Sequence, residues 1–148
     1  MPPEATSGVS PPTWSRTVIR PGPPTALRIA FAGARSGSVN IYVMNADGTG
    51  SVTRLSPSFG EWPAWSPNGS RVAYSDIGIV VIDVDGTGAV HLTDGSFDWM
   101  PTWSSDGTRI AFARGYDEVY VVNADGSGLV NLTNHEFHDY DPAWGRAR

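Results

Sequence analysis

The sequence predicts an all-β protein built from tandem copies of one small antiparallel sheet. Two repeated blocks support this prediction. The first block is PAWSPNGSRVAYS at residues 63–75, and it returns as PTWSSDGTRIAFA at residues 101–113. The second block occurs three times in phase with the first, as IYVMNADGTGSVTRLS, IVVIDVDGTGAVHLT and VYVVNADGSGLVNLT. Asp-Gly pairs begin at Asp47, Asp85 and Asp125, so the period is 38 and then 40 residues.

Each period contains four strand-like segments, and a period near 40 with four strands is typical of a β-propeller blade. The first strand lies around Trp65 and ends in the turn at residues 66–69, whose composition favours a tight reversal. In the second strand the two-residue period of side chains predicts that Val72 and Tyr74 share one face and Ala73 lies on the other.

The third strand of each unit is IYVMN, IVVID or VYVVN, which is almost wholly apolar and β-branched or aromatic. This composition indicates a strand covered on both faces by neighbouring blades. An Asp-Gly turn with glycine at a positive φ leads into a short polar fourth strand. That strand ends in Leu55, Leu92 or Leu132, and we expect it to form the outer edge of the blade.

The composition agrees with an all-β protein and argues against several other kinds of protein. The 148 residues include 17 Gly and 12 Pro, with 40% hydrophobic and 11% aromatic residues, which favours short strands and tight turns within one globular domain. Cysteine is absent, so no disulfide and no thiolate metal site can form. A net charge of −5 argues against binding to nucleic acid. No apolar run approaches the roughly 18–20 residues of a membrane span.

The amino-terminal residues 1–11 are rich in Pro, Ser and Gly, and we expect a disordered arm followed by a repeat domain over residues 12–148. This arm lacks the apolar core of a signal peptide. The repeat pattern PxWSxDGxxIAF followed by IYxxNxDGSGxxxLT resembles the repeat of the TolB C-terminal propeller and its WD40-like relatives, over about residues 12–144. The resemblance implies a six-bladed bacterial architecture, a non-catalytic protein-binding or scaffolding role, and a periplasmic or extracellular location.

The number of blades is smaller than a ring requires. The units cover about residues 12–60, 61–98 and 99–139, and a closing strand is expected at residues 140–144. Propellers close with about four to eight blades, and three blades would leave two exposed sheet edges. One solution is a homodimer that makes six blades, so that each chain forms half of a ring. The alternative is a fragment of a longer propeller.

The segments at the two ends of the repeats bear on ring closure. PTWS at residues 12–15 resembles a first strand, but Trp14 and Phe31 are 17 positions apart, where Trp65 and Tyr74 are 9 apart. The tail DPAW at residues 141–144 is a further candidate first strand. We expect this tail to complete the first blade of its own chain or of a partner. Trp65, Trp103 and Trp144 recur at one repeat position and are predicted to pack between blades.

The connections between blades are the predicted binding surface, because each brings aromatic and acidic residues together ahead of a proline. Exposed aromatic residues would anchor a protein or peptide partner, and the acids would favour a cationic one. The alternative is that Phe59, Phe97, Trp99 and Tyr140 pack between the blades. The candidate residues are Glu61, Trp62, Asp98, Trp99, Asp139, Tyr140 and Asp141.

Metal binding and catalysis have weak support in the sequence. Asp83 and Asp85 resemble the start of a calcium loop, but the distal Glu is missing, and a hairpin turn with an Asx hydrogen bond is the preferred interpretation. His135, His138 and Asp139 could in principle hold a metal ion, although a loop fixes no common face for them. No GxSxG elbow and no Lys are present. We therefore expect no catalytic residues and no cofactor. The alternative is a companion domain of a hydrolase or lyase.

Overall fold

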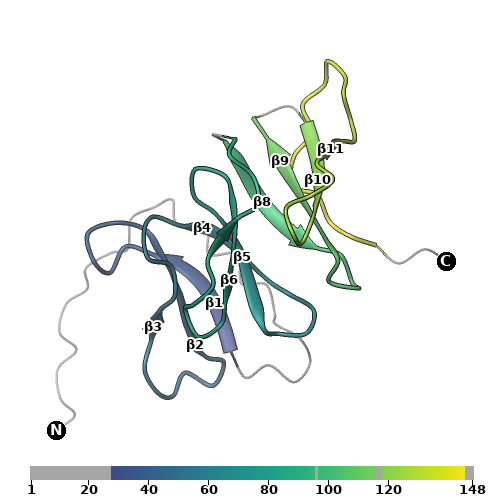
Figure 1. Ribbon diagram of the computed structural model, residues 1–148. Coiled ribbons are helices and arrows are strands. Elements are labelled where there is room, and N and C mark those ends of the chain that lie inside the picture. The colour runs from purple at the N-terminus through teal and green to yellow at the C-terminus, as the bar shows by residue number, and fades with distance from the viewer. Residues whose placement is uncertain (1–27, 96, 116–117, 146–148) are drawn as a thin grey trace, which may run out of the picture.

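Three antiparallel sheets make up the computed structural model, which describes residues 28–95, 97–115 and 118–145 (Figure 1). The first sheet has the order β1-β2-β3, the second β4-β5-β6-β7, and the third β11-β10-β9-β8. The strands are β1 (Arg28–Gly33), β2 (Asn40–Asn45), β3 (Thr53–Arg54), β4 (Glu61–Trp65), β5 (Arg71–Ser75), β6 (Ile79–Asp83), β7 (Val90–His91), β8 (Asp98–Trp103), β9 (Arg109–Arg114), β10 (Glu118–Asn123) and β11 (Val130–Asn131).

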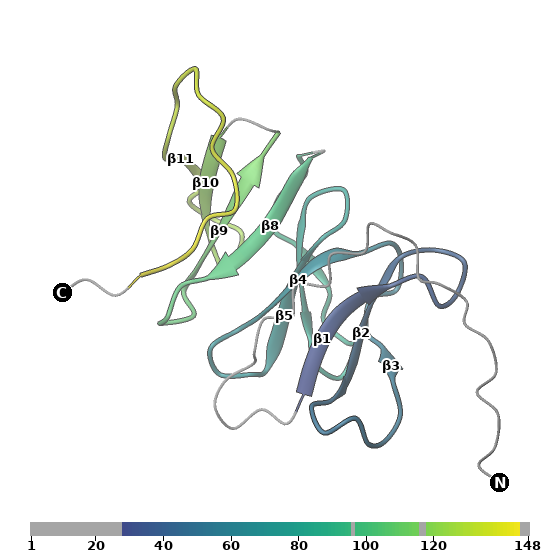
Figure 2. The same ribbon diagram turned by 180° about the vertical axis from the view of Figure 1, so that it is seen from behind.

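The sheets follow one another like blades, with the second sheet between the first and the third in both views (Figures 1 and 2). Strand β4 contacts β1 on one side and β8 on the other. One apolar cluster joins the first and second sheets through residues such as Ile41 and Tyr74, and another joins the second and third through Ile79 and Phe112. The core therefore consists of layers between blades. In the described residues no helix is long and apolar enough to cross a membrane.

Burial along the strands confirms the predicted faces. Val72 and Tyr74 belong to the cluster shared with the first sheet, whereas Ala73 belongs to the cluster shared with the third. The third strand of the second sheet is buried from Ile79 to Ile82, as expected of a strand covered on both faces. By contrast, β7 is two residues long and exposed. It is the outer edge of its sheet, as predicted.

The Asp-Gly turns have the predicted Asx hydrogen bonds. Oδ1 of Asp85 accepts hydrogen bonds from the backbone N of Thr87 at 2.9 Å and from its Oγ1 at 2.7 Å. The turns that begin at Asp47 and Asp125 repeat both bonds with Thr49 and Ser127. Each carboxylate is thus used to close its own turn. These bonds depress the pKa of Asp85, chiefly through the Thr87 side chain.

The first strand of a blade is longer than the sequence predicted. The sequence predicts that Glu61, Trp62, Asp98 and Trp99 lie in connecting segments, but they lie within β4 and β8. The reason is a bulge before the proline, where Trp62 has φ 55° and the register shifts between Glu61 and Ala64. Proline has no N–H to donate, so it sits in the bulge and pairing resumes beyond it.

The structure describes the two ends of the predicted repeat array to different extents. The candidate first strand at residues 12–15 and the arm at residues 1–11 lie outside the described residues. The expected closing strand at residues 140–144 is described, but it carries no strand assignment. A strand is defined by pairing, and none of the described strands is registered with this tail. Trp144 nevertheless donates its indole N–H to the carbonyl of Thr102 at 3.1 Å, which docks the tail on the third sheet.

Candidate binding surface at one end of the sheets

Large apolar side chains are exposed where the first strand of each blade begins. This surface, here called the apolar end, includes the connections that enter β4 and β8, the turn between β5 and β6, and the loop after β11. Phe97 is 70% exposed, Phe137 68%, Ile77 66%, Tyr140 64% and Phe59 43%. Isolated exposed apolar residues are ordinary, but five on the same end of adjacent sheets make this end the candidate binding surface. Because strands alternate in direction, one end of every sheet collects these connections.

Acidic side chains lie among these apolar residues. Glu61 begins β4 and is partly exposed, and Asp94 lies exposed in the connection to β8. Asp76, in the β5–β6 turn beside Ile77, accepts a hydrogen bond from Oγ of Ser58 at 3.1 Å. Asp141 is exposed on the tail. This part of the surface therefore combines apolar area with negative charge.

The predicted candidates Trp62 and Trp99 meet across the boundary between the second and third sheets. Their rings make an edge-to-face contact with centroids 6.4 Å apart and an interplanar angle of 84°. Both side chains are partly buried. Such a pair adds roughly 0.5–1.5 kcal/mol beyond the area that it buries. This contact fixes the two sheets relative to each other, and it leaves part of each ring at the surface.

Asp98 is not an exposed acid, because the structure buries it at the start of β8 with 2% exposure. Its carboxylate receives two hydrogen bonds from Arg114, from Nε to Oδ1 at 2.7 Å and from Nη2 to Oδ2 at 2.8 Å. Oγ1 of Thr93 donates a third at 2.5 Å. A fully paired carboxylate has little capacity left for a partner. Asp98 thus holds the connection to the sheet, and the negative charge of the surface comes from its neighbours.

The loop after β11 is organised by His135. Its Nε2 lies 3.0 Å from Oδ2 of Asp139, its Nδ1 accepts a hydrogen bond from the backbone N of Phe137 at 3.2 Å, and its ring contacts the Phe137 ring. Among the described residues no group of three or more His, Cys, Asp and Glu side chains is placed to hold a metal ion. The His135–Asp139 pair joins the two sides of this loop, with both groups partly exposed to water.

Sequence reasoning missed Ile77, Asp76 and Phe137. The β5–β6 turn looked like a simple connection, since only the inter-blade segments contain the aromatic and acidic pairs before proline. A signal was present in Ser-Asp-Ile-Gly at residues 75–78, where a branched apolar residue occupies a turn that polar residues usually fill. Antiparallel pairing then brings this turn to the same end as Glu61, opposite Ser75 in the register.

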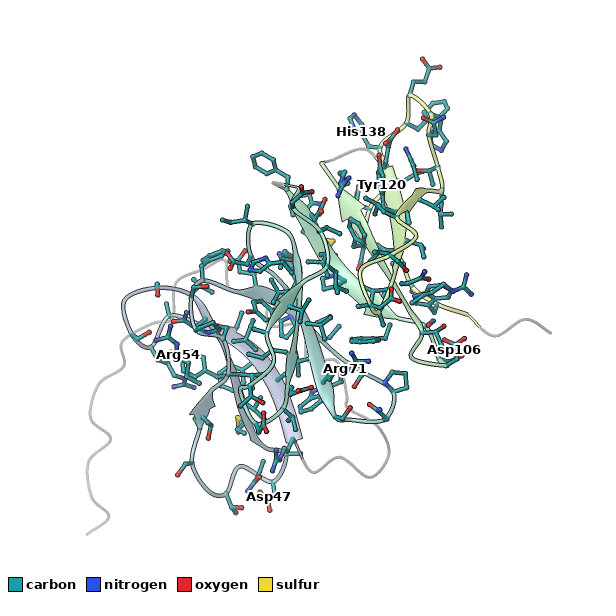
Figure 3. All side chains as sticks on the ribbon, viewed as in Figure 1. Asp47, Arg54, Arg71, Asp106, Tyr120 and His138 are labelled. Atoms are coloured by element: carbon teal, nitrogen blue, oxygen red, sulfur yellow. The ribbon has the colours of Figure 1, made fainter. Side chains whose placement is uncertain are left out.

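The opposite end of the sheets contains the tight turns, and Figure 3 labels Asp47 and Asp106 at this end. His138 lies at the other end of the third sheet, in the loop after β11 (Figure 3). An open depression of about 320 Å³ lies between the β4–β5 and β8–β9 turns. Its lining residues are Ser66, Pro67, Asn68, Arg71, Ser105, Asp106 and Gly107. Asn68 closes its own turn by accepting hydrogen bonds from Ser66 and Ser70, and Asp106 does the same for Ser104 and Thr108. The guanidinium of Arg71 lies over the Trp103 ring, 5.1 Å from its centroid.

The pKa of Asp106 tests the hydrogen bonds of its turn. The Ser104 hydroxyl, followed by the backbone and side chain of Thr108, holds the pKa of the Asp106 carboxyl at about 2 instead of 3.8. A depressed pKa means that the carboxylate stabilises the fold above the unfolded-state value, and that this contribution is lost as the pH falls toward 2. We expect an NMR titration of the carboxyl carbon to give a midpoint near 2. Ser104→Ala should raise that midpoint toward 3.8, and Thr108→Val should raise it less. A wild-type midpoint near 3.8 would contradict the assigned hydrogen bonds.

The observed sheets define a class of protein. Each complete unit has four antiparallel strands in sequence order and an outer edge of two residues, and successive units pack face to face. The third strand is buried from Ile79 to Ile82 in the second sheet, but in the third sheet β10 is only partly buried. These are β-propeller blades. A family model for the TolB β-propeller domain matches residues 21–148. The chain belongs to the TolB β-propeller family.

Solved structures agree with this assignment. The chain is similar to TolB from Acinetobacter baumannii, with 27% identity and a TM-score of 0.71 over 83% of this chain and 33% of that one. A putative TolB from Agrobacterium tumefaciens has 24% identity and a TM-score of 0.65 over 78% of this chain and 48% of that one. An oligogalacturonate lyase in complex with manganese shares the fold at 13% identity, with a TM-score of 0.57 over 71% of this chain and 36% of that one.

The chain thus spans less than half the length of each of these structures. No curated protein matches its sequence.

Proposed function

We propose that this chain is a non-catalytic protein-binding or scaffolding propeller module, and that it binds a cationic peptide segment of its partner at the apolar end. The observation that carries the proposal is the gathering of Phe59, Ile77, Phe97 and Tyr140 on one end of adjacent blades. Aromatic side chains offer large contact areas at low entropic cost, which suits them as anchors. The candidate residues of the tail, Tyr140 and Asp141, extend this surface along the third blade.

Charge supports a cationic partner. The partly exposed Glu61 and Asp76 and the exposed Asp94 lie between the apolar residues, while the guanidinium of Arg114 is engaged by Asp98. A negative field around an apolar surface speeds the encounter with a positive segment and disfavours an acidic one. The net charge of −5 for the whole chain acts in the same direction.

We further propose that two copies form the working module, with three blades from each. Two observations support this proposal: within the described residues β1 has a strand on one edge only, and Leu132 of the third sheet is 58% exposed. Covering such edges is a general requirement, because unpaired backbone groups otherwise recruit other strands. A ring of two copies places the apolar ends of all blades on one face. That arrangement enlarges the binding surface without any new residue.

Capture of synthetic peptides tests the binding role. The probe is an array of twelve-residue peptides that contain Arg, Lys and one aromatic residue, each paired with a peptide in which Glu replaces the basic residues. We expect the protein to retain the basic set and to release it as salt increases. The double variant Phe97→Ser with Tyr140→Ser should bind at least tenfold more weakly, since about two aromatic anchors at roughly 1–2 kcal/mol each are lost.

The matched control removes exposed apolar side chains from the outer strands of the second and third sheets. Val90 and Val130 are 53% and 52% exposed on the outer strands β7 and β11, away from the apolar end. Val90→Ser with Val130→Ser should leave peptide capture unchanged. Equal loss in both double variants, or equal retention of the acidic peptides, would refute the proposed surface.

A further inference from the structure

An open depression lies between the second and third blades, at the end of the sheets that contains the tight turns. Its walls are the β4–β5 turn and the β8–β9 turn, and its volume is about 320 Å³. This volume is at the lower limit of small-molecule sites, which span roughly 300–1,000 Å³. The depression therefore has room for a small ligand. It is separate from the apolar end, which lies at the other end of the strands.

The two turns approach each other, and both are closed by hydrogen bonds of their own. A Cβ placed on Gly107 would lie 3.6 Å from Cδ of Pro67, so the third blade meets the second here. Oδ1 of Asn68 and Oδ1 of Asp106 each accept three hydrogen bonds from within their own turns. These bonds fix both walls of the depression without any help from a ligand.

Arg71 supplies the positive charge of the depression. Its side chain is partly exposed, and its guanidinium lies over the Trp103 ring, 5.1 Å from the centroid. Contact with an aromatic face holds a guanidinium in place. No hydrogen bond or ion pair among the described residues uses its N–H groups. A guanidinium presents these donors in a planar fork that matches a carboxylate, so Arg71 is suited to bind one.

Asp106 supplies the negative charge. Its Oδ1 accepts hydrogen bonds from Oγ of Ser104 at 2.6 Å and from N and Oγ1 of Thr108 at 3.0 and 2.8 Å. Its Oδ2 accepts none from the described residues. The carboxylate is exposed, and its pKa of about 2 keeps it charged at neutral pH. Oδ2 is therefore available to a cation that enters the depression.

These two charges together select the kind of ligand. Figure 3 labels Arg71 on the second sheet and Asp106 on the third, and both line the depression, yet they form no ion pair with each other. A simple anion on Arg71 would face the Asp106 carboxylate, and a simple cation on Asp106 would face the Arg71 guanidinium. A ligand with both charges is attracted at both places. The depression thus favours a small zwitterion over a ligand with a single charge.

We propose that this depression binds a dipeptide-sized zwitterion, with the terminal carboxylate on the Arg71 guanidinium and the terminal ammonium on Oδ2 of Asp106. Ser105 and Asn68 line the same space, and their exposed hydroxyl and amide groups can bond the peptide group between the two termini. The site lies beyond the proposed function, because it gives a second kind of ligand to the opposite end of the blades.

Titration with alanylalanine, followed by backbone amide NMR, tests the site. We expect the dipeptide to shift the signals of the β4–β5 and β8–β9 turns and to leave those of the apolar end unchanged. Two blocked forms separate the charges, since N-acetyl-alanylalanine lacks the ammonium and alanylalanine amide lacks the carboxylate. Each should bind at least fivefold more weakly, because it loses a charge-assisted hydrogen bond and meets a like charge.

Two variants assign the charges to residues. Asp106→Asn removes the negative charge and keeps the turn, since Asn68 closes the equivalent turn of the second blade with the same three bonds. It should weaken alanylalanine at least fivefold and should not weaken N-acetyl-alanylalanine. Arg71→Gln should likewise weaken alanylalanine at least fivefold and should not weaken alanylalanine amide.

Arg109→Gln is the matched control. Arg109 lies over the Trp144 ring at the same 5.1 Å, but it does not line the depression. Its charge adds to the hydrogen bonds of Ser104 and Thr108 in lowering the pKa of Asp106, so its removal takes a competing cation away from that carboxylate. The control variant should therefore bind alanylalanine at least as tightly as the unchanged protein.

Three results would overturn the proposal. The first is that alanylalanine shifts no amide signal of either turn up to its limit of solubility. The second is equal binding of alanylalanine and N-acetyl-alanylalanine, which would leave an anion site at Arg71 alone. The third is equal weakening by Arg71→Gln and Arg109→Gln, which would show that only the total positive charge matters. Peptide capture by the apolar end uses other residues, so failure at either end leaves the other proposal intact.

Discussion

Replacing Phe112 with alanine is expected to lower the free energy of unfolding by about 3–5 kcal/mol, the largest effect of any single change considered. Phe112 is completely buried in the cluster between the second and third blades, and its ring stacks on Tyr120 with centroids 5.9 Å apart. Removing the ring loses its transfer free energy and leaves a cavity that the strands on both sides hold open. Urea denaturation followed by circular dichroism measures the change.

Phe31 supplies the matched control for this substitution. It occupies the same repeat position in the first blade and stacks on Tyr42 in the same way, at 5.9 Å, but it is only partly buried. Phe31→Ala should therefore cost only about 1–2 kcal/mol, in proportion to the smaller area removed from water. Equal losses of unfolding free energy for Phe31→Ala and Phe112→Ala would contradict the difference in burial between these two side chains.

Replacing Arg114 with alanine is expected to lower the free energy of unfolding by about 3 kcal/mol. The side chain of Asp98 is wholly inaccessible and depends on the guanidinium, which in turn is 28% exposed. Loss of one partner of a buried pair leaves an uncompensated charge, at a cost of about 3–5 kcal/mol, and the partial exposure of Arg114 places this case at the lower limit. The hydrogen bond to Asp98 also raises the pKa of Arg114, so the guanidinium stays charged at all ordinary pH values.

Two further variants separate this cause from a general loss of packing. Asp98→Asn in the Arg114→Ala background should recover part of the stability, because it removes the stranded charge. Arg109→Ala is the control: Arg109 is exposed and lies over the Trp144 ring at 5.1 Å, an interaction of about 0.5–1 kcal/mol. If Arg114→Ala costs no more than Arg109→Ala in thermal or urea unfolding, Asp98 does not require its partner.

The repeats in the sequence determined the blades. Recurrence of the Trp65 position at Trp103 and of the Asp85 turn at Asp125 predicted the order and edges of the strands in the second and third sheets, because side-chain period and turn chemistry are local properties. The buried third strand of the second sheet and the short outer strands followed from composition alone. Packing of Trp103 between blades was also predictable, since a large apolar residue that recurs with the period must occupy the repeated interface.

The tertiary structure decided what these residues can do. Asp98 and Glu61 look alike in the sequence, each next to an aromatic residue before a proline, yet one is buried against Arg114 and the other is partly exposed. Leu92 and Leu132 are equally alike, yet Leu92 lies against the turn at Gly126 and is 8% exposed, whereas Leu132 is 58% exposed in the described residues. Such differences depend on which segments meet across the fold, and a local pattern does not encode them. Placement in space therefore separates the residues that hold the blades together from those that are free to meet a partner.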